Sequence, residues 1–153
     1  MKVYLDVCCL CRPFDDQLIP RIRYENEAVI AILNRCSRDW ELIWSSAITY
    51  EIAKIIDHDR RHYVSTFAAK TTTNILVDMA IKERAAELMN LGVKALDALH
   101  IACAERAGAT VLITTDDALK NIMSHHSDII SIRIVNPSVW YEEVTGNESE
   151  DTA

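Results

Sequence analysis

The sequence predicts an α/β fold, a three-layer α/β/α sandwich with a central, mostly parallel sheet. Short apolar runs alternate along the chain with longer segments in which apolar residues recur at helical spacing. The apolar runs lack a regular polar alternation, as expected for strands that are buried on both faces. The chain has 153 residues and is 50% apolar, which suffices for one domain with a substantial core. Repeated strand–helix–strand order implies right-handed crossovers between parallel strands.

The first half of the chain begins with a predicted strand and a loop. Residues 3–10 are predicted to form a buried strand, and residues 12–19 a loop with prolines at its two ends. Residues 21–38 place apolar side chains at helical spacing and predict an amphipathic helix. The other elements predicted here are a strand at 42–44, a helix at 47–57 capped by Ser45 or Ser46, and a helical segment at 59–69.

The second half of the chain contains the two most regular helical patterns. Residues 80–90 and 96–107 predict helices that stop before Gly92 and Gly108. Residues 71–78 are compatible with a loop or a short strand. The remaining predicted elements are strands at 109–115 and 129–135, a helix at 116–123 and a short helix at 136–141. We therefore expect a single domain over residues 1–144 and a polar, acidic, disordered tail over residues 145–153.

The charge and the cysteine content restrict the possible functions. A formal net charge of −7 argues against broad, nonspecific nucleic-acid binding, which requires basic surface. It does not exclude a nuclease, because carboxylates that hold divalent cations also make the formal charge negative. Five cysteines and a start without an export signal predict reduced thiols in the cytoplasm. No run of about 18 uncharged apolar residues occurs, so no membrane span is expected.

Four acidic residues are candidates for one shared site. Asp6 and Asp116 follow predicted strands, where parallel sheets place their ligands. Asp97 lies in the first turn of a helix among apolar residues, and Glu51 flanks an apolar helix face. Taken singly, each could be a helix cap, a turn residue or a solvated side chain. Together they favour one crevice with the hard oxygen ligands that suit Mg²⁺ or Mn²⁺, which predicts metal-assisted hydrolysis of a phosphodiester.

Other chemically active residues also allow plainer interpretations. Cys8, Cys9 and Cys11 do not have the spacing of a zinc site, and their pattern favours packing in the first strand and its exit. His100 is one helical turn from Asp97 and could line the same pocket, although a packed, hydrogen-bonded helix histidine is the commoner case. Arg12 is a candidate contact to a substrate phosphate, and a solvated position fits it equally well.

The motifs around the four acids resemble the PIN-domain family of metal-dependent nucleases, which includes the VapC-like toxins of bacterial toxin–antitoxin pairs. The stretches VYLDVCCL, SSAITYEI and KALDALHIACAERAGATVLITTDDALK are similar to the motifs of this family. They carry Asp6, Glu51, Asp97 and Asp116. The start YLDVCCLCRPFDD further resembles a subgroup of stand-alone bacterial PIN proteins.

The resemblance implies an α/β/α sandwich whose acidic pocket binds Mg²⁺ or Mn²⁺ and cleaves single-stranded RNA. The four acids would then be both the metal ligands and the catalytic residues. The resemblance also implies a homodimer and a small antitoxin protein that neutralises the nuclease.

The sequence departs from the family pattern at two positions near the first acid. Val7 stands where the family often has Ser or Thr, and Cys11 stands where the stand-alone subgroup has Asn. An alternative function is therefore a weakly active or inactive PIN module that binds RNA or protein. Asp117 also competes with Asp116 for the fourth acidic position, although Asp116 better fits the T-x-D spacing from Thr114.

Overall fold

The sheet is entirely parallel and forms the middle layer of the molecule. The computed structural model describes residues 1–152, with side chains described through residue 149. The described residues form five parallel strands in the order β3–β2–β1–β4–β5. The strands are β1 (Lys2–Leu5), β2 (Glu41–Ser45), β3 (Thr73–Ile75), β4 (Val111–Ile113) and β5 (Arg133–Val135). This confirms the predicted α/β class with a parallel central sheet.

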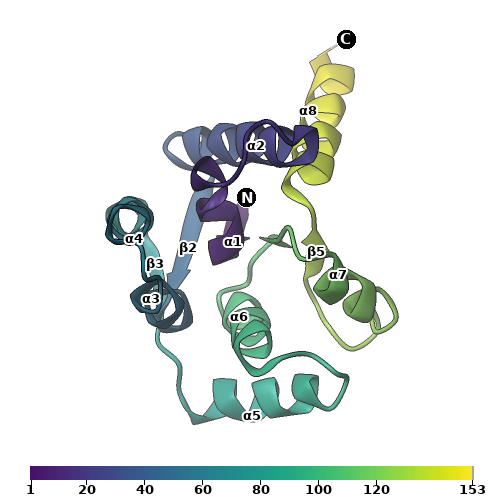
Figure 1. Cartoon of the computed structure of the whole chain (residues 1–153). Helices are drawn as coiled ribbons and strands as arrows, with labels where there is room; N and C mark the ends of the chain where they lie inside the picture. Colours follow the sequence, from purple (N-terminus) through teal and green to yellow (C-terminus); the bar gives the residue numbers. More distant parts are fainter. Residues whose placement is uncertain (153) are drawn as a thin grey trace.

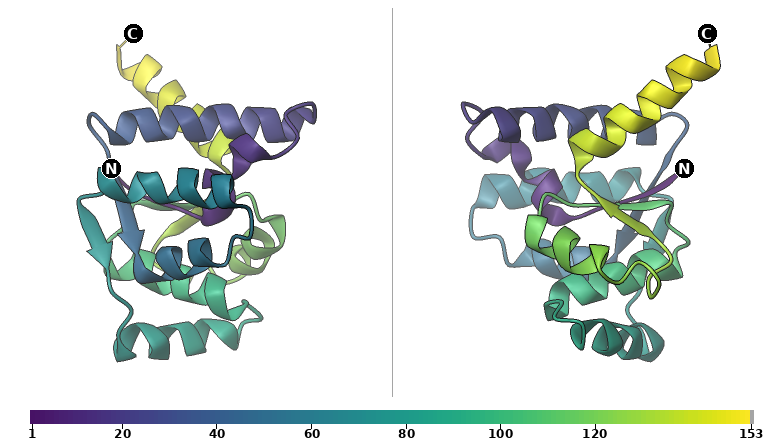
Figure 2. Two further views of the ribbon diagram at one scale, coloured as in Figure 1. Left: turned by 60° about the vertical axis from the view of Figure 1, so that its left-hand side comes forward. Right: turned by 90° about the vertical axis from the view of Figure 1, so that its right-hand side faces the viewer.

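Helices cover both faces of the sheet (Figure 1). The helices are α1 (Val7–Leu10), α2 (Pro20–Cys36), α3 (Ser46–Ala53), α4 (His58–Ser65), α5 (Met79–Met89), α6 (Ala95–Arg106), α7 (Asp117–Ser124) and α8 (Pro137–Thr152). On one face α2 packs against α8, and on the other α6 packs against β2 and β4 while α5 covers α6 (Figure 2). Within residues 1–152, no helix is long and apolar enough to cross a membrane.

Strand β1 lies at the centre of the sheet and places the first acid at its carboxyl edge. Tyr4 pairs with Ile43 of β2 on one side and with Leu112 of β4 on the other. Asp6 follows the last residue of β1, and its backbone N–H donates to the carbonyl oxygen of Ile113 over 2.9 Å. Asp6 therefore lies at the carboxyl edge of the central strand, where the backbone is held on both sides.

The first predicted strand is too long, because the chain turns at Asp6. Strand β1 stops at Leu5, and residues 7–10 form the short helix α1 instead of continuing the strand. A short apolar run satisfies burial equally well as a strand or as a helical turn, so periodicity could not distinguish them. The strands predicted at 109–115 and 129–135 also shorten, to Val111–Ile113 and Arg133–Val135.

The C-terminal helix is longer than predicted. Helix α8 continues through residues 145–152, where the sequence predicted a disordered tail. The Arg35 guanidinium on α2 pairs with the Glu148 carboxylate over 2.9 Å, and the rings of Trp40 and Trp140 pack with centroids 5.1 Å apart. The first contact helps to hold residues 145–152, whose composition alone does not predict a helix, and the second packs the preceding part of α8 against the residue before β2. Residue 153 of the predicted tail lies outside the described residues.

Candidate active site

The structure brings the four predicted acids together in one cavity of about 400 Å³. Asp6 follows β1, and Glu51 lies in α3. Asp97 lies in the first turn of α6, and Asp116 is the N-cap residue of α7. The cavity is therefore assembled from four segments that are distant in sequence and meet at the carboxyl edge of the sheet, as parallel topology requires.

Asp6 is buried and held in a fixed orientation. Its side chain is 6% exposed, and the Thr114 hydroxyl donates to Asp6 Oδ2 over 2.8 Å. The same Thr114 oxygen accepts the backbone N–H of Asp116 over 3.1 Å. Burial, followed by the nearby Glu51 carboxylate, raises the pKa of Asp6, against the opposing influence of His100 and Thr114. Thr114 was not predicted as a site residue, because its role depends on β4 lying next to β1.

Thr114 also compensates for the missing hydroxyl group at position 7, where this chain has Val instead of the Ser or Thr of the family pattern. Val7 provides no hydroxyl next to Asp6, but Thr114 supplies one from the end of the neighbouring strand. Cys11 is buried where it lines the cavity, and burial raises the pKa of its thiol to about 11, so this side chain is uncharged at neutral pH. The structure thus places a hydroxyl group, that of Thr114, next to Asp6, although position 7 of the sequence does not provide one.

The cysteines of the opening motif belong to α1 and its end. Cys9 is fully buried and its thiol donates to the carbonyl oxygen of Ile113 over 3.4 Å, whereas Cys8 lies 3.6 Å from the Thr114 hydroxyl. All five cysteines of the chain lie within the described residues and are free thiols. Their packing role is the predicted one, but a helical turn provides it in place of a strand.

Asp116, not Asp117, lines the cavity. Asp116 Oδ1 accepts the backbone N–H of Leu119 over 3.1 Å and so caps α7. The Asp117 carboxylate accepts two hydrogen bonds from Arg21, at 2.6 and 2.8 Å, and also pairs with Lys120. Asp117 is therefore an exposed ion-pair partner outside the cavity, and the geometry favours Asp116 as the fourth acid.

His100 lies at the bottom of the cluster with only 2% of its surface exposed. Its Nδ1 is 2.6 Å from the Tyr4 hydroxyl, which is itself 2.7 Å from the Ser45 hydroxyl. Its Nε2 lies 3.5 Å from Glu51 Oε2. Burial lowers the pKa of His100, but the Glu51 and Asp6 carboxylates outweigh burial and leave it raised. The histidine is both packed and directed toward the acids.

The donor set fits a divalent cation. Ligand atoms of Asp6, Glu51 and His100 all lie within 4.8 Å of one another. Glu51 Oε2 is buried and finds no hydrogen-bond partner within the described residues. Carboxylates gathered around a buried one, Asp6, repel each other unless a cation or protons compensate their charge. We therefore assign this cluster, with Asp97 and Asp116 at the same cavity, as the candidate metal centre.

The titration of Asp97 gives the metal centre a predicted pH dependence. Burial, followed by the charges of Asp6 and Asp116, raises the pKa of Asp97 to about 6. A cation binds the ionised carboxylate, so protonation of Asp97 competes with metal binding. We expect Mn²⁺ affinity to weaken by up to about tenfold per pH unit as the pH falls below about 6. Calorimetric titrations on both sides of this pH measure it, and a constant affinity would contradict the assignment of Asp97.

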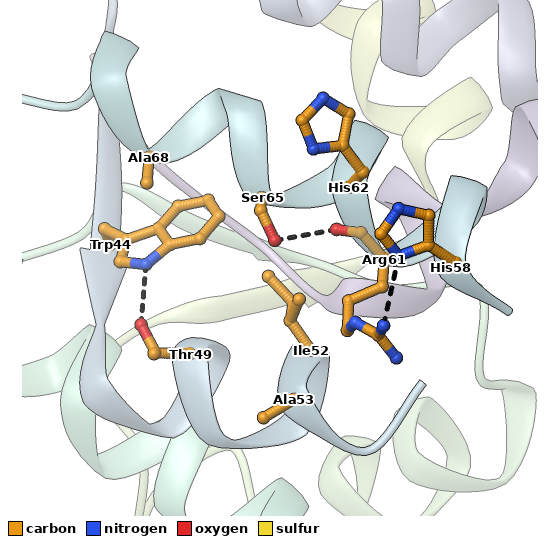
Figure 3. A pocket seen from close by; sticks show the side chains of 9 residues that line it. All are labelled: Trp44, Thr49, Ile52, Ala53, His58, Arg61, His62, Ser65 and Ala68. Carbon is orange, nitrogen blue, oxygen red and sulfur yellow. Dashed lines mark hydrogen bonds between the residues drawn. The ribbon is translucent and has the colours of Figure 1, made fainter. Parts of the chain in front are cut away.

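A second cavity of about 380 Å³ lies between α3 and the segment that contains α4 (Figure 3). Trp44 and Ile52 contribute to an apolar floor, and His58, Arg61 and His62 lie at the opposite side. The lining residues in the described part of the chain include no Asp or Glu. The histidine rings are exposed and stack with centroids 6.4 Å apart. This cavity therefore lacks the hard oxygen ligands that the acidic cavity provides.

Comparisons with known proteins agree with the fold. The family model described as PIN domain matches residues 18–123, which include Glu51, Asp97 and Asp116. Among solved structures, VapBC2 from Rickettsia felis bound to a promoter DNA fragment is similar, with a TM-score of 0.57 and 14% identity over 89% of this chain and 98% of that chain. VapBC-1 from nontypeable Haemophilus influenzae gives a TM-score of 0.57 and 12% identity, covering 90% and 99%. The curated proteins contain no match.

Proposed function

The chain belongs to the PIN-domain family, and on this basis we propose that it is a Mg²⁺- or Mn²⁺-dependent endoribonuclease that cleaves single-stranded RNA. The observation that carries the proposal is the convergence of Asp6, Glu51, Asp97 and Asp116 on one cavity. Carboxylates in this arrangement suit a hard divalent cation that also binds substrate phosphate. A bound cation would supply Lewis acidity for in-line attack of water at phosphorus and for departure of the leaving oxygen.

The residues of the chain divide the remaining work between them. Thr114 holds the Asp6 carboxylate in one orientation, and the N-cap hydrogen bond of Asp116 holds its carboxylate after the neighbouring strand β4. Arg12 and Arg60 line the same cavity and place positive charge beside the acids. Because a guanidinium presents several donors to phosphate oxygens, these arginines are suited to position the RNA backbone.

The two arginines retain donors that the protein does not use. Arg12 pairs with Asp15 over 2.8 Å and with Glu25 over 3.3 Å, and Arg60 lies 3.8 Å from Asp15. The buried Nε atoms of Arg12 and Arg60 find no hydrogen-bond partner among the described residues. Arg12 is a candidate from the sequence, where a solvated position fits it equally well, whereas Arg60 reaches the cavity from α4 and is not among the sequence candidates.

Replacing Arg60 with Ala is expected to weaken RNA binding without changing metal binding. Loss of one charge-assisted contact to phosphate corresponds to about tenfold in KM, or about 1.4 kcal/mol. Steady-state cleavage kinetics and Mn²⁺ calorimetry would measure the two effects separately. The matched control is Arg38→Ala, since Arg38 is exposed in the turn between α2 and β2. Equal KM values for Arg60→Ala and the unmodified protein would rule out this contact.

The proposed activity is tested by cleavage of matched single-stranded RNA and DNA oligonucleotides. We expect cleavage of RNA with Mg²⁺ or Mn²⁺, no cleavage with EDTA, and no cleavage by the Asp97→Asn variant under any of these conditions. Cleavage that persists in EDTA, or in Asp97→Asn, would contradict the metal-dependent mechanism. The hydroxyl supplied by Thr114 favours an active enzyme over a module that only binds RNA or protein.

We further propose that the protein is a cytoplasmic, homodimeric toxin with a small antitoxin partner. The support is its membership of the PIN family together with the fold it shares with proteins of two VapBC complexes. Induced expression in a bacterial host is expected to arrest growth, and Asp97→Asn is expected not to. Co-expression of a small protein encoded beside this gene should restore growth and yield a complex on size-exclusion chromatography.

A further inference from the structure

His100 differs from the acids of the candidate metal centre because its imidazole offers a nitrogen atom as a ligand. It is 2% exposed, and its Nε2 is buried without a hydrogen-bond partner among the described residues. The neighbouring Glu51 Oε2 is also buried without such a partner, and the two atoms are 3.5 Å apart. Leaving a buried polar atom unsatisfied costs about 1–3 kcal/mol. Nε2 and Oε2 face each other in a long pair, and a cation between them would satisfy both atoms.

A chain of hydroxyl groups behind His100 can set its tautomer. Tyr4 lies 2.6 Å from His100 Nδ1, and its hydroxyl lies 2.7 Å from that of Ser45. If Nδ1–H donates to the Tyr4 oxygen, the Tyr4 hydroxyl can donate in turn to Ser45. The lone pair of Nε2 then faces Asp6 and Glu51. A hydrogen-bonded partner on the far nitrogen is the usual arrangement for a metal-binding histidine.

We propose that His100 Nε2 is a ligand of the cation, beside Asp6 and Glu51, and that the site therefore binds Mn²⁺ in preference to Mg²⁺. Neighbouring ligands about 2.1 Å from an octahedral ion lie about 3.0 Å apart, so the observed 3.5 Å between Nε2 and Oε2 requires only a small closure around the ion. The inference rests on the proposed function only in that both place a cation in this cavity.

A nitrogen ligand changes which cations the site favours. Mg²⁺ is a hard ion that takes oxygen ligands and retains several waters. First-row transition ions accept imidazole readily, and Mn²⁺ is the weakest binder among them. Coordination by His100 should therefore favour Mn²⁺ over Mg²⁺, and this preference is smaller than the one expected for the other first-row transition ions. A site made only of carboxylates gives no reason to expect such a preference.

The decisive measurement detects the nitrogen directly on the unmodified protein. Electron spin echo spectroscopy of the Mn²⁺-loaded protein should show coupling to an imidazole nitrogen, and incorporation of ¹⁵N-histidine should change that signal in the manner expected for the isotope. The coupling should be absent in His100→Gln and unchanged in His125→Gln. His125 is exposed at the end of α7 and serves as the matched control.

Calorimetry gives a second, independent readout. We expect His100→Gln to bind Mn²⁺ about 10–100-fold more weakly while Mg²⁺ affinity changes by less than about threefold. Tyr4→Phe should keep the nitrogen coupling and lose a smaller part of the Mn²⁺ affinity. Circular dichroism would verify that each variant is folded.

The outcomes separate this inference from the proposed function. If Mn²⁺ binds without nitrogen coupling, His100 is not a ligand and instead supports Glu51 by hydrogen bonding, while the acidic metal site stands. If neither Mn²⁺ nor Mg²⁺ binds at millimolar concentration, both the inference and the proposed metal-dependent nuclease fail. Equal losses of Mg²⁺ and Mn²⁺ affinity in His100→Gln would overturn the proposed selectivity.

Discussion

Replacing Asp6 with Asn is expected to reduce metal-dependent RNA cleavage at least about 100-fold, because the loss of Lewis-acid stabilisation amounts to several kcal/mol. The substitution preserves the size of the side chain and removes its negative charge. Because Asp6 is buried at the end of the central strand, no mobile surface carboxylate can take over its position in the Asp6→Asn variant. The rate of cleavage at saturating Mn²⁺, together with Mn²⁺ affinity from calorimetry, would measure the effect.

The adjacent acids Asp116 and Asp117 provide a matched pair for this experiment, in which Asp117 is the control. Asp116→Asn should also impair cleavage and metal binding, because Asp116 lines the cavity, and Asn preserves the N-cap of α7. Asp117→Asn should leave both quantities nearly unchanged, because Asp117 is occupied by Arg21 and Lys120 outside the cavity. Cleavage by Asp6→Asn at the unmodified rate, or an equal loss in Asp117→Asn, would show that the site is assigned to the wrong carboxylates.

Asp6 and Asp116 could be placed from the sequence because parallel topology converts a position after a strand into a position at one edge of the sheet, whereas Glu51 and Asp97 were proposed from their helices and from the family resemblance. A residue that directly follows a buried parallel strand must lie at the carboxyl edge, and this applies to Asp6. No such rule gives the positions of the site residues that the sequence did not predict. Thr114 matters because β4 pairs with β1, and Arg60 matters because α4 folds back over the cavity. Such proximities are set by tertiary packing, which one sequence does not display.

The elements at the two ends of the chain show the same limitation. Residues 7–10 are apolar and suit a buried strand, yet the turn at Asp6 makes them a helix. Residues 145–152 are polar, yet α8 extends through them, aided by the contact between Arg35 and Glu148. Local composition predicts how apolar or polar each segment is, but it does not predict the backbone conformation. In the second case, one stabilising partner lies more than a hundred residues away in the sequence.

Glu25 connects the stability of the fold to the geometry of the site. It lies on α2, is 1% exposed, and accepts a hydrogen bond from Asn136 Nδ2 over 2.5 Å. Its carboxylate also pairs with Arg12 over 3.3 Å and with Arg21 over 3.5 Å. The same carboxylate therefore joins α2 to the residue that precedes α8 and restrains an arginine that lines the acidic cavity.

Replacing Glu25 with Ala is expected to lower the free energy of unfolding by about 3 kcal/mol, since removing one partner leaves Asn136 and the arginines without their buried acceptor. Urea unfolding followed by tryptophan fluorescence would measure this loss. Glu25→Gln should lose less, because its amide oxygen can still accept from Asn136, and the exposed Glu27→Ala on the same helix should change stability by less than about 0.5 kcal/mol. Both Glu25 variants should also raise the KM for RNA, because they release Arg12 from its ion pair. If the Glu25→Ala protein is as stable as the unmodified protein, this buried network contributes little to stability.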